Sequence, residues 1–126
     1  MAFIPVEKRL DEQLQVPDLW RPALKQLADF MVLGLSPGAD PLVAMGSIDE
    51  DILKISRGNI KAYPDPLGEL AESAWSTSVS YWIGDCWKLL IDLTAADGTV
   101  TDLVLHAEVK ETESGYAIEP GLIYVP

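Results

Sequence analysis

The stretch CWKLLIDLTAADGTVTDLVLHAEVKE, residues 86–111, decides the fold that this sequence predicts. Apolar residues take every second position on both sides of a turn-forming ADG segment. That period of two is typical of paired antiparallel strands with one buried face and one face that carries polar residues. The stretch therefore predicts a β-hairpin at the centre of an antiparallel sheet.

The loop of this hairpin sets the register of its two strands. A two-residue loop would mix polar and apolar residues on each face, whereas a three-residue loop over residues 96–98, with its glycine left-handed, keeps the faces separate. We therefore predict the three-residue loop. It pairs Ile91 with Leu103 on the apolar face, and it pairs Asp92 with Asp102 on the polar face.

The polar face raises the functional question, because it carries Asp92, Asp102, His106 and Glu108. Two directly opposed carboxylates, about 5 Å apart at Cβ, repel each other. In a covered pocket this repulsion raises one pKa strongly, as in acid–base sites, whereas water screens the pair on an open face. Three interpretations stay open: a solvated face, a carboxylate site in a pocket, and a face that docks a partner.

Further strands are predicted on both sides of the hairpin. Residues 75–82, WSTSVSYW, alternate as a strand does, and residues 116–125 form the last strand. The last strand contains Pro120 and Gly121, which a central, fully paired strand would not tolerate. We therefore predict a bulge or an edge position there.

The first half of the chain has the periodicity of helices. An apolar stripe at a spacing of four predicts a short helix over residues 6–14, and a wider stripe predicts a longer one over residues 19–33. A third helix is predicted from Ser47, where the SIDE segment can form a capping box, to a stop at Gly58.

These elements make one domain over residues 1–126, with a helical part over residues 1–62 and a sheet part over residues 74–126. Helices that precede a run of strands are typical of the α+β class. The predicted fold is α+β, with N-terminal helices packed on a four-stranded antiparallel meander sheet.

The charge of the chain limits its partners. The formal net charge is −11, and residues 63–126 carry eleven acidic residues against only Lys88 and Lys110. Such a chain repels nucleic acid and anionic lipid and attracts a basic protein. The sequence also shows no apolar run of about 18 residues for a membrane span and no signal-peptide pattern, so we expect a cytoplasmic protein.

The sequence contains no motif that predicts catalysis or a cofactor. It lacks G-x-S-x-G, G-x-G-x-x-G and phosphate-binding glycine loops. His106 is the only histidine, and no cysteine cluster accompanies it, so we expect no metal and no cofactor. Cys86 is the only cysteine, and we expect it to be a small core residue.

The strands WKLLIDL and TDLVLHAEV, behind AWSTSVSYW and the LWRPALKQLADFMV helix, resemble a small bacterial domain family of unknown function. The resemblance covers about residues 19–126. Its order of elements is also similar to the cystatin-like and nuclear-transport-factor-like curved-sheet folds. The isomerase subclass of those folds would imply a pocket base and an oxyanion tyrosine, but no residue here matches either motif. The most specific positions of the resemblance are Trp75, Trp87, Asp92, Asp102 and Leu103.

Two functions follow as hypotheses. The first is an acidic cytosolic binding protein, immunity-like or an adaptor, that masks a basic protein partner with a contiguous negative surface. The second is a small pocket enzyme or ligand binder that uses Asp92 and Asp102. The candidate binding residues are Asp92, Asp102, His106, Glu108, Glu111, Tyr81 and Trp82.

Overall fold

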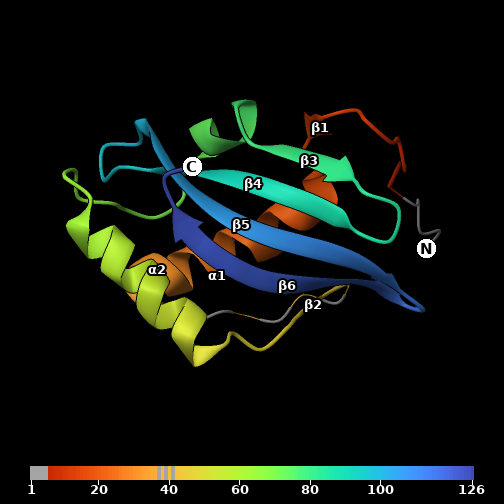
Figure 1. The fold of residues 1–126 in the computed structure, drawn as a ribbon, viewed down its shortest axis with the longest axis horizontal. Coiled ribbons are helices and arrows are strands. Elements are labelled where there is room, and N and C mark those ends of the chain that lie inside the picture. Colours follow the sequence, from red (N-terminus) through yellow and green to blue (C-terminus); the bar gives the residue numbers. More distant parts are fainter. Residues whose placement is uncertain (1–5, 37, 39, 41) are drawn as a thin grey trace.

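The computed structural model describes residues 6–36, 38, 40 and 42–126. Its centre is one six-stranded mixed sheet with the strand order β1-β3-β4-β5-β6-β2. Figure 1 shows α1 behind this sheet and α2 beside the end of β6. The strands are β1 (Leu14–Gln15), β2 (Val43–Met45), β3 (Val79–Trp82), β4 (Trp87–Thr94), β5 (Val100–Thr112) and β6 (Gly115–Tyr124). The helices are α1 (Arg21–Leu33) and α2 (Glu50–Ala62), with 3-10 turns η1 (Asp18–Trp20) and η2 (Glu72–Ser76).

The predicted fold class is wrong in its sheet and in its N-terminal helices. The sheet has six strands, not four, and two of them come from residues 1–62, which the sequence assigned to helices. β1 pairs antiparallel with β3, and β2 pairs parallel with β6, so the sheet is mixed. The helix predicted over residues 6–14 is absent from the described part of the chain, because Leu10 bridges to Trp82 and Leu14 belongs to β1.

The two α-helices have clear local causes. α1 carries Pro22 in its first turn, where proline costs no hydrogen bond, and ends at Gly34 in the left-handed conformation. The side chain of Asp49 caps α2 by accepting from the amides of Asp51 and Ile52. The capping box predicted at Ser47 is therefore wrong. The predicted stop at Gly58 is also wrong, because α2 continues to Ala62 and ends just before the prolines at positions 64 and 66.

The register of the central hairpin is shifted from the predicted one. The loop is as predicted, since Ala95 N donates to Thr99 O and Gly98 has a φ of 89°. A bulge follows between β4 and β5, where the Thr101 hydroxyl donates to Leu93 O and accepts from Leu103 N. The bulge moves β5 by two residues, so that each side chain keeps its face but changes its partner.

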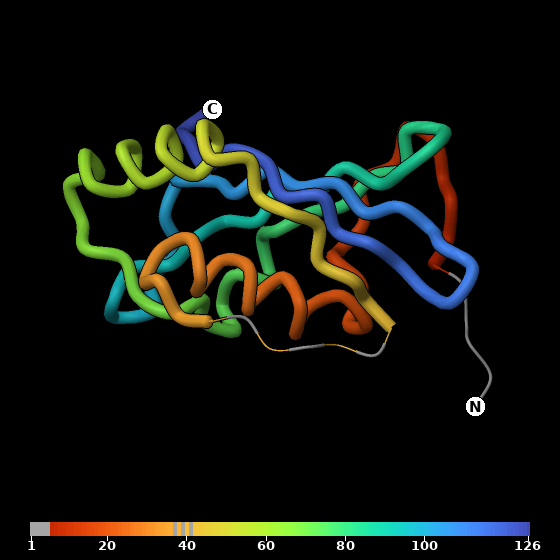
Figure 2. The backbone as a smooth tube through the Cα atoms, turned by 90° about the horizontal axis from the view of Figure 1, so that it is seen from below, coloured from red at the N-terminus to blue at the C-terminus, as the bar shows by residue number. Residues whose placement is uncertain are grey.

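The inner face of the sheet forms the core with α1 (Figure 2). The apolar face predicted for the hairpin is buried, as is the predicted apolar stripe of the helix over residues 21–33. These residues share an exposure of 1% or less: Leu24, Leu27, Met31, Leu89, Ile91, Leu103 and Leu105. Where β6 extends past its pairing with β2, Ser56 of α2 accepts from the amide of Ile123 and Asn59 donates to its carbonyl, which satisfies backbone groups that would otherwise be open.

Candidate functional site

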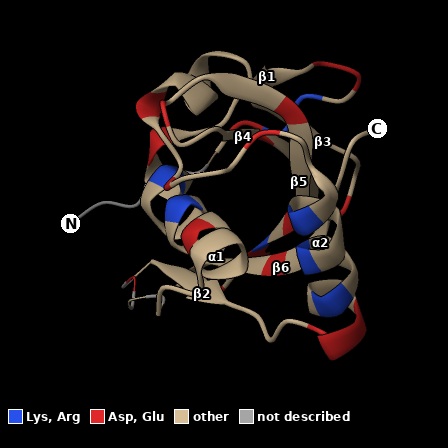
Figure 3. Ribbon diagram, turned by 90° about the vertical axis from the view of Figure 1, so that its left-hand side faces the viewer, with Lys and Arg blue, Asp and Glu red and all other residues tan. Residues whose placement is uncertain are grey.

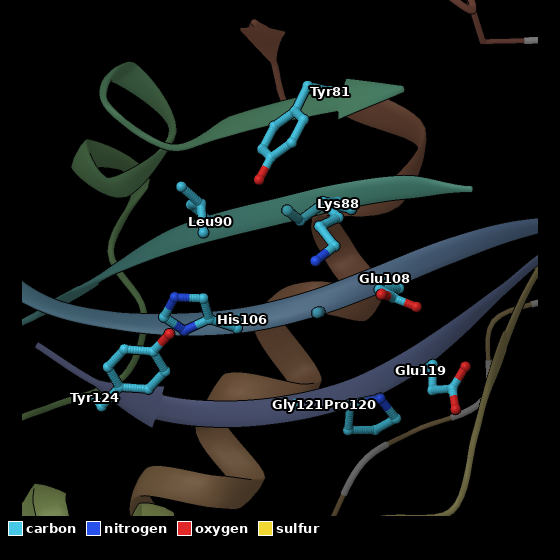
Figure 4. Close-up of a pocket in the computed structure, with 11 residues that line it drawn as sticks. Tyr81, Lys88, Leu90, His106, Glu108, Glu119, Pro120, Gly121 and Tyr124 are labelled. Atoms are coloured by element: carbon cyan, nitrogen blue, oxygen red, sulfur yellow. The ribbon is translucent and has the colours of Figure 1, made fainter. Parts of the chain in front are cut away.

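The candidate site is the outer face of the sheet, the face turned away from α1. No helix or loop in the described ranges of the chain lies over it (Figure 1). A hollow of about 510 Å³ lies across β3, β4, β5 and β6 on this face. Figure 4 shows the side chains that line the hollow. They are Tyr81, Lys88, Leu89, Leu90, His106, Ala107, Glu108, Glu119, Pro120, Gly121 and Tyr124.

One row of cross-strand partners runs over the four strands and carries the charges of the hollow. Tyr81 pairs with Lys88, Lys88 with Glu108, and Glu108 with Glu119. Glu108 and Glu119 are thus directly opposed carboxylates on neighbouring strands, an arrangement that destabilises a sheet unless a cation offsets it. Lys110 forms an ion pair with Glu119 at 3.3 Å, and this hydrogen bond raises the pKa of Lys110.

The next side of the hollow is formed by stacked rings. His106 lies flat on Tyr124, with ring centroids 4.2 Å apart and an angle of 4° between the planes. Its Nδ1 lies 3.1 Å from Leu122 O, so Nδ1 carries the proton in the neutral ring and Nε2 is left as the acceptor. The stacked rings therefore form an aromatic wall of the hollow, and His106 Nε2 is not used by the hydrogen bond to Leu122.

A bulge in β6 makes this stack possible. The register shifts between Leu105 and Ala107 of β5, so an extra residue of β6 lies opposite His106. Gly121 has to be glycine there, because a Cβ would come 2.6 Å from His106 O. Of the two alternatives predicted at Pro120 and Gly121, a bulge or an edge position, the structure shows the bulge.

The structure brings together three of the predicted binding residues and separates the others. Tyr81, His106 and Glu108 line the hollow. Asp92 is half-buried on the same face, and its backbone amide donates a hydrogen bond to Ser78 Oγ at 2.9 Å. Trp82 lies on the inner face against Trp87, with ring centroids 4.7 Å apart.

The predicted carboxylate pair of Asp92 and Asp102 is not formed. Asp92 lies opposite Val104, because of the bulge at Thr101. Asp102 is exposed and accepts a hydrogen bond from the hydroxyl of Tyr63, which raises the pKa of that tyrosine. The pocket enzyme built on this pair therefore loses the geometry that motivated it.

The acidic residues are spread over the molecule and do not gather in one half. Figure 3 shows them on both helices, on strands and in loops. Glu111, which the sequence analysis placed in the binding surface, forms an ion pair with Lys8 at 2.9 Å. On the outer face, Glu119 bonds Lys110, and Glu108 lies opposite both Lys88 and Glu119.

Cys86 is a buried thiol whose surroundings disfavour the thiolate. Burial raises its pKa to about 11, and the carboxylates of Glu108 and Asp85 add to this effect. Only the thiolate reacts with alkylating reagents. We expect iodoacetamide at pH 8 to label native Cys86 about 100-fold more slowly than the urea-unfolded chain, because the thiolate fraction falls by that factor when the pKa rises from 9.0 to about 11. Equal rates, measured by mass spectrometry, would contradict the buried position.

The predicted list of binding residues did not include Lys88, Glu119 or Tyr124, which line the hollow. Lys88 and Glu119 are cross-strand neighbours of Glu108, a relation that only the true register reveals. Tyr124 faces outward because the bulge at Gly121 resets the alternation of β6 by one residue. The Pro120-Gly121 pair was the signal in the sequence for this change of face, because a bulge opposite His106 turns Tyr124 outward.

Among the residues that the structure describes, no helix is long and apolar enough to cross a membrane, and no group of three or more His, Cys, Asp or Glu residues is arranged to hold a metal ion.

The comparisons with known proteins give one match. The profile of a family described as "Domain of unknown function (DUF7668)" matches residues 32–126, a segment that contains every residue lining the hollow. Searches of curated proteins and of solved structures gave no match. The match starts at the end of α1 and covers more than half of the chain, which confirms the expected membership of a domain family of unknown function. The chain belongs to the DUF7668 family.

Proposed function

We propose that this domain is a protein-binding module whose partner presents a basic segment to the outer face of the sheet. The observation that supports this most is the pair of opposed carboxylates, Glu108 and Glu119, in one cross-strand row with Lys88 and Tyr81 on an uncovered face. In the cell, such a module would act as an immunity-like or adaptor protein in the cytoplasm that masks the basic surface of its partner.

The chemistry of the hollow suits a lysine or arginine side chain. A cation between Glu108 and Glu119 offsets the repulsion of two like charges and forms charge-assisted hydrogen bonds. Tyr81, at the end of the same row, offers an aromatic ring to a cation or to its aliphatic stem. Lys110 does not block this contact, because its side chain is 55% exposed and can turn to solvent.

The net charge of −11 adds an effect at longer range. A negative field attracts a cationic partner and raises the association rate, whereas it repels nucleic acid and anionic lipid. Salt screens this field, with a Debye length of about 10 Å at 0.1 M ionic strength. The association rate should therefore fall with added salt, while the dissociation rate depends on the contacts in the hollow.

Selection from a displayed library of random peptides tests this proposal without a known partner. We expect the selected peptides to be rich in lysine and arginine. The affinity of one such synthetic peptide, measured by fluorescence anisotropy, should fall about tenfold in the double variant Glu108→Gln/Glu119→Gln, because two charge-assisted contacts are lost.

The control is the double variant Glu72→Gln/Glu113→Gln, in which both residues are exposed and lie outside the hollow. It changes the net charge by the same amount and should keep the wild-type dissociation rate. An equal loss of affinity in the two variants would show that the acidic residues act only through the net charge of the domain. Selection of acidic or uncharged peptides would contradict the proposal.

A further inference from the structure

A second hollow lies at the sheet edge and shares Tyr81 with the first. It is lined by Leu10, Asp11, Glu12, Gln13, Tyr81, Trp82 and Ile83, and its volume is about 460 Å³. Tyr81 lines both hollows, so the two adjoin each other at this residue of β3. The first of them is the site of the proposed function, and the second is not used by it.

The edge hollow exposes large apolar side chains. Leu10 is 64% exposed and Ile83 is 42% exposed. Backbone pairing positions both residues beside the hollow, since Leu10 bridges to Trp82, and Ile83 N donates to Cys86 O at 2.9 Å. Exposed apolar side chains that adjoin a hollow are typical of a docking surface, whereas single scattered ones are ordinary.

The rim of the edge hollow is acidic. Asp11 turns the chain with a φ of 60° and has no ion-pair partner among the described residues. Glu12 bonds Arg9 at 3.5 Å, a long contact between side chains that are about half exposed. An apolar floor with an acidic rim complements a segment in which an apolar side chain lies next to lysine or arginine.

We infer that the edge hollow binds an apolar anchor residue, of the size of leucine, isoleucine or methionine, in the same basic segment that the outer face binds. This inference rests on the proposed function and specifies the sequence of the partner's segment. The segment carries a lysine or arginine that contacts Glu108 and Glu119, and an apolar anchor residue that binds beyond Tyr81. The segment crosses β3, since both hollows open beside Tyr81.

The test measures binding of the selected basic peptides to the double variant Leu10→Ser/Ile83→Ser. The matched control is Leu33→Ser/Ile55→Ser, because Leu33 is 45% exposed, Ile55 is 53% exposed, and neither lines a hollow described here. We expect about a tenfold loss of affinity in the first variant, as for truncation of an anchor residue, and no loss in the control.

Three outcomes are distinct. Unchanged binding of basic peptides to Leu10→Ser/Ile83→Ser would overturn the anchor hollow and leave the proposed function intact. A library that yields no basic peptides would overturn both. A peptide alignment with one apolar residue at a constant distance from a lysine or arginine, together with the tenfold loss, would support both. If the double variant unfolds, the single variant Leu10→Ser repeats the measurement at the more exposed position.

Discussion

Replacing Trp87 with alanine should lower the free energy of unfolding by about 3–5 kcal/mol, the usual cost of truncating a buried tryptophan. Trp87 is 1% exposed and its ring lies within 5.1 Å of Trp20 and 5.8 Å of Tyr116, measured between centroids. Its indole N–H also donates to Glu7 O at 3.1 Å, which ties the N-terminal segment to β4. The substitution removes the aromatic packing and leaves that carbonyl without its donor.

Urea unfolding followed by circular dichroism measures this loss. The control is Ile55→Ala on α2, where the side chain is 53% exposed and alanine favours a helix, so the change should stay within about 0.5 kcal/mol. A loss below about 1 kcal/mol at Trp87 would show that the rings do not form one packed cluster.

Replacing Gly115 with alanine should destabilise the protein by about 1–3 kcal/mol, because there is no room for a side chain. A Cβ at this position would come 2.1 Å from Leu42 O. That carbonyl accepts the hydrogen bond of Tyr116 N at 2.8 Å, next to the pairing of Val43 with Tyr116. The variant therefore forces β2 away from β6 and tests the parallel pairing directly.

Gly58→Ala is the matched control for this prediction. Gly58 lies inside α2, and no atom lies within 4 Å of a Cβ built there, so alanine should stabilise the helix by about 0.5–1 kcal/mol. Hydrogen exchange of the Tyr116 amide gives a second readout, since its protection should fall in Gly115→Ala alone. A neutral Gly115→Ala would contradict the mixed sheet.

The central hairpin was predictable because its signal is local and strong. Alternation placed Leu89, Ile91 and Leu105 on a buried face, and it also placed His106 on the opposite one. The register of β4 and β5 was not predictable, because it depends on a bulge at Thr101. There the Thr101 hydroxyl, and not a backbone group, bonds Leu93 O and Leu103 N. That bulge separated Asp92 from Asp102, whereas the opposition of Glu108 and Glu119 comes from the register of β5 and β6.

The N-terminal half was harder to predict because its strands are very short. β1 has two residues and β2 has three, too few for any periodicity to appear. Both depend on distant partners, since β1 pairs with β3 and β2 with β6. The apolar stripe of Val6, Leu10 and Leu14 fits a helix as well, and only the long-range pairing with β3 decides against it.

The central claim, that the outer face of the sheet binds a basic segment, is tested most directly by nuclear magnetic resonance. A short synthetic peptide rich in lysine and arginine, with one leucine, is titrated into the labelled protein while backbone amide shifts are followed. We expect the largest changes at Tyr81, Glu108 and Glu119 and at their neighbours on β3 to β6. Changes confined to α1, α2 or the loop of Asp97, or no saturable change at all, would contradict the claim.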